Sequence, residues 1–382
     1  MRALLVFALL TAVAMDGWIW QAQDLLAQDL PQQSAENPET VETVETVESA
    51  AARLGNDNPQ AQIYTRDDQD FFLFQAWQAR DASERQAIHH IGALFEFVDD
   101  HFVISNLYEA YPAINAGLRR GDIMISIDGN PFHPVHSFNP GTGAAEKVLS
   151  FLRDGQQLSV ELRPVYENLY DSMRRATVNS VSRYPSGNKL VCYVHWWAAS
   201  RSLADILADR DLFAGLRTCD GLVLDLRGAF GYFDWTHLDF FFNTRNNFPL
   251  IRKTNLEQEI EYRAPPRDPY LQIRSFDRPI ALLINERTRG GMELIAHHLI
   301  KSGRATSVGV PTAGFVADIE QIAGDVEAGW LMYLPDSELF INEVNLQHEG
   351  AIPQALQEWP ISSSYSNDPQ FDAALFDLMG II

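Results

Sequence analysis

Hydrophobic and polar positions divide the chain into a polar start and two regions with different periodicities. Residues 71–91 place apolar side chains such as Phe71, Phe74 and Trp77 among polar neighbours, and we predict a helix there. Short apolar runs separated by turn signals follow, as expected of strands. They predict strands at 93–98, 102–107, 123–127 and 158–162, with a helix at 144–153 before the last one. Residues 90–166 therefore form one small, mostly β unit.

The second half of the chain alternates apolar strands with helices. The predicted strands are 190–197, 221–226, 280–284 and 306–310, and the predicted helices are 203–216, 236–243 and 292–301. Unbroken apolar strands separated by helices are typical of a mostly parallel sheet covered on both faces. The charged stretch 248–273 interrupts this order and is expected to be an insertion with a small sheet of its own. Residues 182–382 are thus predicted to be an α/β domain.

The first 62 residues differ in composition from the rest. A positive start at Arg2, an apolar run and small residues near Ala14 are typical of an export signal, which we assign to residues 1–20. The apolar run is too short to span a bilayer by itself, and an uncleaved membrane anchor is the alternative. Residues 21–62 are acidic and poor in large apolar side chains, so we expect a disordered linker. A helical segment at 63–89 follows it.

Charge and cysteine content narrow the possible partners. The formal net charge of −22 and the absence of a basic run argue against nucleic acid, which binds cationic patches. The only two cysteines, Cys192 and Cys219, fall in or beside predicted core strands. An exported chain could join them in a disulfide. We favour two buried free thiols, because the sequence does not give their separation.

A motif in the first unit points to peptide recognition. Residues 110–129 read AYPAINAGLRRGDIMISIDG, and this run resembles the PDZ domains of exported bacterial proteases. The segment Ile91-Gly92-Ala93-Leu94 stands where such a domain keeps its carboxylate-binding loop. A peptide end is held there by backbone N–H groups and by pairing with a strand edge. The resemblance therefore implies a PDZ domain at 90–166 and a peptide-binding role for these four residues.

Several motifs of the second unit resemble the tail-specific, or carboxyl-terminal processing, serine proteases. The strand CDGLVLDLR at 219–227 looks like their core strand, and GAFGY at 228–232 stands where their oxyanion pocket forms, with Gly231 retained. Residues 278–296 and 303–316 match the segments that carry the family's nucleophilic Ser and general-base Lys. The Ser position is Gly290 and the Lys position is Phe315. The resemblance implies the family's α/β core, of the ClpP and crotonase type.

The residues at these two positions cannot perform the family's chemistry. A hydroxyl nucleophile must be deprotonated by a nearby amine, but Gly290 has no side chain and Phe315 has no titratable group. The four lysines, Lys147, Lys189, Lys253 and Lys301, are assigned to a PDZ helix, a strand start, the insertion and a helix end. None is expected to replace the base. A rearranged Thr288–His237–Asp234 triad is the catalytic alternative.

Other polar residues receive structural interpretations. Asp225 is expected to pair with Arg227 or a backbone donor, and Glu293 to suit the helix dipole. The neighbouring His297 and His298 lack the i, i+4 spacing of a metal clamp, so we predict no metal and no cofactor.

Three hypotheses about function remain. The leading one is an exported, periplasmic or extracellular, noncatalytic homologue that binds polypeptide C-terminal ends or a periplasmic protein, as an adaptor or regulator. The second is an active peptidase with a rearranged site. The third is a carrier of small apolar ligands, with a pocket lined by Phe230, Tyr232, Phe233, Phe315 and Met292. The oligomeric state does not follow from the sequence. A contact with the membrane is expected only through an uncleaved leader.

Overall fold

The computed structural model describes residues 62–79, 82–138, 145–254, 258–316, 322–333, 338–361 and 367–382. The predicted export signal lies outside the described residues, as does the predicted linker up to its last residue. No helix in these ranges is long and apolar enough to cross a membrane.

The second half forms a six-stranded sheet, as the alternation of strands and helices predicts. The strand order is β10-β11-β13-β17-β19-β24, and every neighbouring pair is parallel except β10 and β11. The bounds are Ser182–Ser186 (β10), Lys189–His195 (β11), Gly221–Asp225 (β13), Ile280–Ile284 (β17), Ala305–Gly309 (β19) and Ala355–Leu356 (β24). Both β13 and β17 are buried along their whole length, as strands of a sheet covered on both faces should be.

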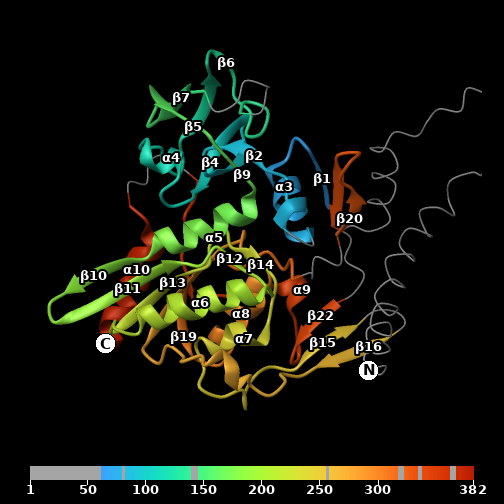
Figure 1. Ribbon diagram of the computed structural model, residues 1–382. Coiled ribbons are helices and arrows are strands. Elements are labelled where there is room, and N and C mark those ends of the chain that lie inside the picture. The colour runs from blue at the N-terminus through green and yellow to red at the C-terminus, as the bar shows by residue number, and fades with distance from the viewer. Residues whose placement is uncertain are drawn as a thin grey trace, which may run out of the picture. The chain divides into compact units, whose positions relative to one another are not determined.

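Helices cover both faces of this sheet (Figure 1). One face carries α6 (Leu203–Leu216), α7 (Trp235–Asp239) and α8 (Gly291–Lys301), and the other carries α10 (Pro369–Ile381). Successive side chains of a strand point to opposite faces. In β13, Leu222 and Leu224 accordingly pack with the three-helix face, while Val223 packs with α10. The α/β fold class is therefore confirmed.

The two cysteines form a disulfide, so our preference for free thiols is wrong. Cys192 lies in β11 and Cys219 lies just before β13, and the parallel pairing of these strands brings their Cα atoms to 5.8 Å. This separation is within the range that a disulfide spans. It depends on which strands are neighbours, which the sequence alone did not establish.

Antiparallel strands fill most of the predicted PDZ segment. The sheet order is β3-β4-β5-β7-β8, and β6 pairs with β5. The bounds are Ala93–Val98 (β3), His101–Leu107 (β4), Ile123–Ile127 (β5), Asn130–Pro131 (β6), Lys147–Arg153 (β7) and Gln156–Leu162 (β8), with a short helix α4 at Pro112–Asn115. The strands β2 (Ile88–His90) and β9 (Val165–Glu167) pair where the chain enters and leaves this sheet, and α5 (Leu169–Ser180) leads on to β10.

The helix predicted at 144–153 is wrong, because most of this segment is the strand β7. Its buried residues are Leu149 and Phe151, which alternate with less buried neighbours. The turn between β7 and β8 is Asp154-Gly155, and both residues have positive φ, 51° and 74°. That geometry is typical of a two-residue hairpin turn. Lys147 consequently belongs to a strand and not to a helix.

The first predicted helix is shorter than expected. Helix α3 covers Gln69–Gln78 and ends well before residue 91; a 3₁₀ turn (η1, Ala82–Glu84) and β2 follow it. Its residues from Phe71 to Trp77 are all buried, because α3 packs against both the first sheet and the α/β unit. Next to it, β1 (Gln62–Thr65) joins β21 (Trp330–Tyr333) and β20 (Ile322–Asp325) in a small sheet.

The insertion predicted at 248–273 does carry a small sheet. Its strands β15 (Ile251–Thr254) and β16 (Glu259–Tyr262) pair antiparallel, and a turn η2 (Pro269–Leu271) follows. Two later strands, β22 (Glu338–Ile341) and β23 (Val344–Asn345), extend the sheet before α9 (Leu346–Glu349).

Candidate functional site

Three short strands form the centre of the candidate site, at the carboxyl ends of the main sheet. They are β12 (Ala198–Ala199), β14 (Phe230–Gly231) and β18 (Arg289–Gly290), and they pair in parallel. Their register places Gly231 beside both Ala199 and Gly290. The predicted oxyanion residue and the predicted nucleophile position are therefore direct neighbours.

Gly290 and Phe315 are also brought together. The Gly290 N–H donates to the Phe315 carbonyl at 2.6 Å. Gly290 has a φ of +66°, and a Cβ atom added there would lie 2.7 Å from the Gly231 carbonyl oxygen. A residue with a side chain would meet both a crowded backbone and an unfavourable conformation at this position.

Backbone N–H groups that line this centre donate to carbonyl groups of the chain itself. The N–H of Phe230 donates to Trp197 and that of Tyr232 to Ala199, at 3.0 and 2.9 Å. The N–H of Arg289 donates to the Ala229 carbonyl at 2.9 Å. An oxyanion pocket requires donors that are free to face the developing charge. These three donors and that of Gly290 are occupied.

Aromatic rings fill the space around the Phe315 side chain. Phe74 of α3 stacks on Phe315 with ring centroids 5.8 Å apart and meets Phe230 edge-on at 5.3 Å. Tyr333 lies against the other side of Phe315, at 4.0 Å. Phe315 is 6% exposed and Phe230 is fully buried. Helix α3 thus occupies the region that faces the base position.

An ion pair fixes α3 to the residue beside Gly290. Both terminal nitrogens of Arg289 bind the Asp70 carboxylate, at 2.8 and 3.0 Å. Burial would raise the pKa of Asp70, but the charge and hydrogen bonds of Arg289 outweigh it and lower the pKa to about 2. This pair was not predicted from the sequence. The only signals of this pair in the sequence were an acidic residue next to an apolar helical run and an Arg beside the predicted nucleophile position.

Glu293 lies in the first turn of α8 and is completely buried. Its Oε2 accepts hydrogen bonds from the Thr312 hydroxyl and, at 2.7 Å, from the Gly314 N–H. Its Oε1 has no hydrogen-bond partner within the described residues. Burial raises the pKa of Glu293 to about 8, against the hydrogen bonds, which lower it. Burial thus opposes the charged form of Glu293 on which a favourable interaction with the helix dipole depends.

The members of the alternative triad are engaged elsewhere. The Thr288 hydroxyl donates to the Leu226 carbonyl at 2.8 Å. His237 accepts from the Asp234 N–H at Nδ1 and donates from Nε2 to the Ser200 carbonyl, and its burial lowers its pKa to about 4. Nδ1 of His237 therefore belongs to the capping box with Asp234 at the start of α7, and Nε2 ties the ring to Ser200.

The four lysines are distributed over separate elements. Lys147 in β7 forms an ion pair with Asp128 at 2.9 Å. Lys189 opens β11, Lys253 lies in β15, and Lys301 ends α8. Lys189 and Lys301 therefore stand at the end of their element that is farther from β18.

The proposed carboxylate-binding loop is closed by its own contacts. Ile91, Gly92, Ala93 and Leu94 are all buried. The Gly92 N–H donates to His90 Nδ1 at 3.0 Å, and the Gly92 carbonyl accepts from Tyr108. Ala93 begins the edge strand β3, whose outer side is contacted by the Gln69 side chain.

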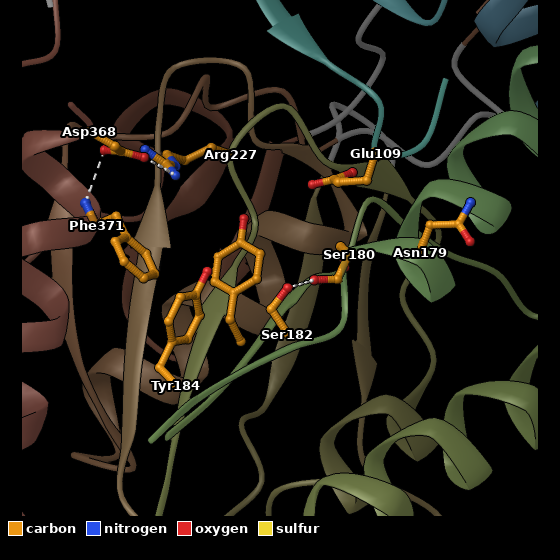
Figure 2. A pocket seen from close by; sticks show the side chains of 9 residues that line it. Glu109, Asn179, Ser180, Ser182, Tyr184, Arg227, Asp368 and Phe371 are labelled. Carbon is orange, nitrogen blue, oxygen red and sulfur yellow. Dashed lines mark hydrogen bonds and ion pairs between the residues drawn. The ribbon is translucent and has the colours of Figure 1, made fainter. Parts of the chain in front are cut away.

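An open pocket of about 310 Å³ lies on the α10 side of the sheet (Figure 2). It is lined by Glu109, Asn179, Ser180, Ser182, Tyr184, Tyr193, Arg227, Asp368 and Phe371. The predicted pairing of Asp225 with Arg227 is confirmed behind it, at 2.5 to 3.1 Å, and Arg227 also binds Asp368 at 2.7 Å. Burial opposes ionisation of Asp225, yet the Arg227 charge outweighs it and lowers the pKa of Asp225.

A buried histidine completes the polar network at this pocket. His195 contacts Glu109 through Nδ1 at 3.1 Å and the Arg227 carbonyl through Nε2 at 2.7 Å. Burial would lower the pKa of His195, but the charges of Asp225 and Glu109 raise it above its usual range. The other oxygen of Glu109 accepts from Trp197 Nε1 at 2.6 Å. The charged groups of this pocket thus satisfy one another, as expected of a structural network.

Comparison with known proteins relates the second unit to a known family. Residues 191–354, less than half of the chain, are similar to peptidase family S41. Among curated proteins, none matches the sequence.

Two solved structures share the fold over most of the chain. A photosystem II D1 C-terminal processing protease is 14% identical, with a TM-score of 0.50, and the match covers 89% of this chain and 86% of that one. A putative S41 protease from Bacteroides fragilis is 18% identical, with a TM-score of 0.56, over 96% of this chain and 97% of that one. At such identities the likeness establishes the fold, including the first sheet, and not the activity.

Proposed function

We propose that this chain is a noncatalytic homologue of the S41 peptidases, exported to the periplasm or cell surface, which binds extended polypeptide ends without cleaving them. The observation that carries the proposal is the closed backbone around Gly290. Its N–H and those of Phe230, Tyr232 and Arg289 donate to carbonyls of the chain, so they are not available to stabilise an oxyanion. The absence of a hydroxyl at Gly290 and of an amine at Phe315 supports the same conclusion.

The peptide-binding half of the proposal is supported by the retained PDZ-type sheet. Peptidases of family S41 act on polypeptide C-termini, and a homologue without a competent site keeps only the recognition step. A strand edge recognises a main chain through hydrogen bonds that do not depend on sequence. The aromatic packing around Phe315 disfavours the apolar carrier, because the rings of Phe74, Phe230 and Tyr333 fill the space a ligand would need.

One experiment tests both halves. Purified protein is incubated with fluorescent peptides that end in a free carboxylate, and cleavage and binding are followed together. We expect saturable binding without cleavage, and no labelling by a fluorophosphonate. Cleavage that is lost in Thr288→Ala or His237→Ala would overturn the noncatalytic assignment. Absence of binding to any peptide would overturn the recognition role.

A further inference from the structure

The outer edge of β3 is covered by one side chain of α3. Gln69 Nε2 donates to the Ala93 carbonyl at 3.0 Å, and Gln69 Oε1 accepts from the Phe95 N–H at 3.3 Å. A carbonyl and an N–H two residues apart on one edge are the groups that a neighbouring strand would bind. The primary amide of Gln69 therefore satisfies the same donor and acceptor as a paired main chain.

The rest of α3 stands beside this edge as a wall. Leu94 packs in the same apolar cluster as Phe71, Phe72 and Leu73 of α3. The helix predicted at 144–153 could have supplied such a wall, but that segment is mostly the strand β7. The edge of β3 and the side of α3 thus form the place where an extended chain would lie.

The edge continues beyond the residues that Gln69 covers. Phe97, which follows Phe95 on the same side of the strand, is 63% exposed, and Val98 is 42% exposed. An exposed strand edge with large apolar side chains is a template for pairing with another chain. Asp99 and Asp100 form the adjoining turn, with positive φ of 49° and 62°, and add negative charge beside the exposed apolar pair.

We infer that Gln69 is a gate on this edge: it occupies the β3 hydrogen-bonding positions until an extended polypeptide segment, apolar with a basic residue, replaces its amide. The inference rests on the proposed peptide-binding function and specifies where binding occurs and what opposes it. Only the Gln69 side chain has to move. Helix α3 remains in place, because its buried aromatic residues and the Asp70–Arg289 pair hold it.

The gate predicts a specific order of affinities. In Gln69→Ala the competing amide is gone, and peptide binding is expected to tighten on the order of tenfold, the gain from two hydrogen bonds that no longer need to be exchanged. In Gln69→Glu the carboxylate still accepts from Phe95 but cannot donate to the Ala93 carbonyl. This variant is expected to bind more tightly than the wild type and less tightly than Gln69→Ala.

The test uses one fluorescent peptide, in which Lys is followed by five residues that alternate between apolar and polar. Its binding is measured to the wild type, Gln69→Ala, Gln69→Glu and a control variant. The control is Gln157→Ala, because Gln157 lies exposed on β8, away from this edge. Amide hydrogen exchange of Phe95 is followed in parallel. We expect faster exchange at Phe95 in peptide-free Gln69→Ala, and protection restored when peptide is added.

The outcomes separate the two proposals. Equal affinity of the wild type and Gln69→Ala, with binding present, overturns the gate and leaves the proposed function standing. No binding to any of the four proteins overturns both. Peptide protection at sites other than β3 overturns the gate, and so does a Gln69→Ala protein that dimerises through this edge without peptide. An unchanged melting temperature in Gln69→Ala shows that the affinity change does not come from unfolding.

Discussion

At Gly290 the backbone, and not only the choice of side chain, supports the proposed loss of catalysis. The residue combines a φ of +66° with a Cβ position that lies against the Gly231 carbonyl and the Phe230 ring. The strand pairing between β14 and β18 brings these backbones together. Restoring a hydroxyl would therefore require the chain to move.

Gly290→Ser is expected to remain inactive and to be less stable by about 1–3 kcal/mol, the usual cost of a strained non-glycine conformation. The double variant Gly290→Ser/Phe315→Lys is expected to be inactive as well, because the N–H groups of Gly290, Phe230, Tyr232 and Arg289 stay occupied. Peptide cleavage and chemical denaturation measure the two effects.

Gly117→Ser is the matched control for this substitution. Gly117 also has a positive φ, of +82°, but no atom of the residues that the structure describes lies within 4 Å of its added Cβ. A smaller loss of stability at Gly117 would assign the difference to crowding. Cleavage by either Gly290 variant would contradict the closed site.

Glu293 gives the chain a stability that depends on pH. Its folded pKa, about 8, is higher than the ordinary value of 4.5. The favourable contribution of Glu293 to the free energy of unfolding is therefore fully present below about pH 4.5 and is lost as the pH rises through about 8. Glu293→Gln has a neutral side chain at every pH. As the pH rises from about 5 to 8, its free energy of unfolding should fall less than that of the wild type, by on the order of a few kcal/mol.

Denaturant unfolding at several pH values measures this difference. Glu161→Gln, on the exposed side of β8, serves as the control and should follow the wild type. Parallel pH profiles of the wild type and Glu293→Gln would show that Glu293 is ionised in the folded protein.

At the scale of elements, helix α3 covers the candidate site and is fixed to it. It supplies Phe74 to the rings around Phe315 and Asp70 to the ion pair with Arg289. Removing one partner of a largely buried pair leaves the other without compensation. Asp70→Asn is therefore expected to lower the free energy of unfolding by about 3 kcal/mol, as measured by urea denaturation.

The exposed Asp67, which pairs with His136, is the control for this change. Asp67→Asn should cost little, because exposed ion pairs contribute less than about 1 kcal/mol. Equal effects of the two substitutions would mean that the Asp70–Arg289 pair does not hold α3.

The sequence predicted most elements of the α/β unit because its strands are uniformly apolar and its helices are separated from them by clear turns. Helix α6 has the predicted bounds, and β17 does too. The error at 144–153 has a local cause. Val148 to Leu152 is apolar enough for either a helix or a strand, and the Asp154-Gly155 turn decides for a hairpin.

The positions of Gly290 and Phe315 could be located from sequence because each lies in a motif with a fixed order. Three features could not be located from the sequence: the occupied N–H donors, Asp70 beside Arg289, and Gln69 on β3. Each joins segments whose separation in the sequence carries no signal, and the contacts of Asp70 and Gln69 also depend on where α3 docks. Element type is a local property, whereas docking depends on the complementary surfaces of distant segments.

At the scale of the whole molecule, the disulfide ties β11 to the start of β13 in the centre of the main sheet. The cysteines are 27 residues apart, and closing a loop of this length is expected to stabilise the fold by about 3 kcal/mol. Reductant should therefore lower the melting temperature of the wild type. Cys192→Ala/Cys219→Ala should start lower and not respond. A wild-type melting temperature that is insensitive to reductant under unfolding conditions would contradict a stabilising bond.

Helix α3 also has a consequence for how the chain is made. Asp70 precedes its partner Arg289 by 219 residues, and at roughly 5–20 residues per second the ribosome needs roughly 10–45 s to cover that distance. During this time the newly synthesised run from Phe71 to Trp77, dense in aromatic rings, has no partner surface from Phe230, Phe315 or Tyr333. Such a segment is prone to aggregate. We therefore expect the nascent chain to need protection by a holding factor until its second half, which supplies these contacts, has emerged.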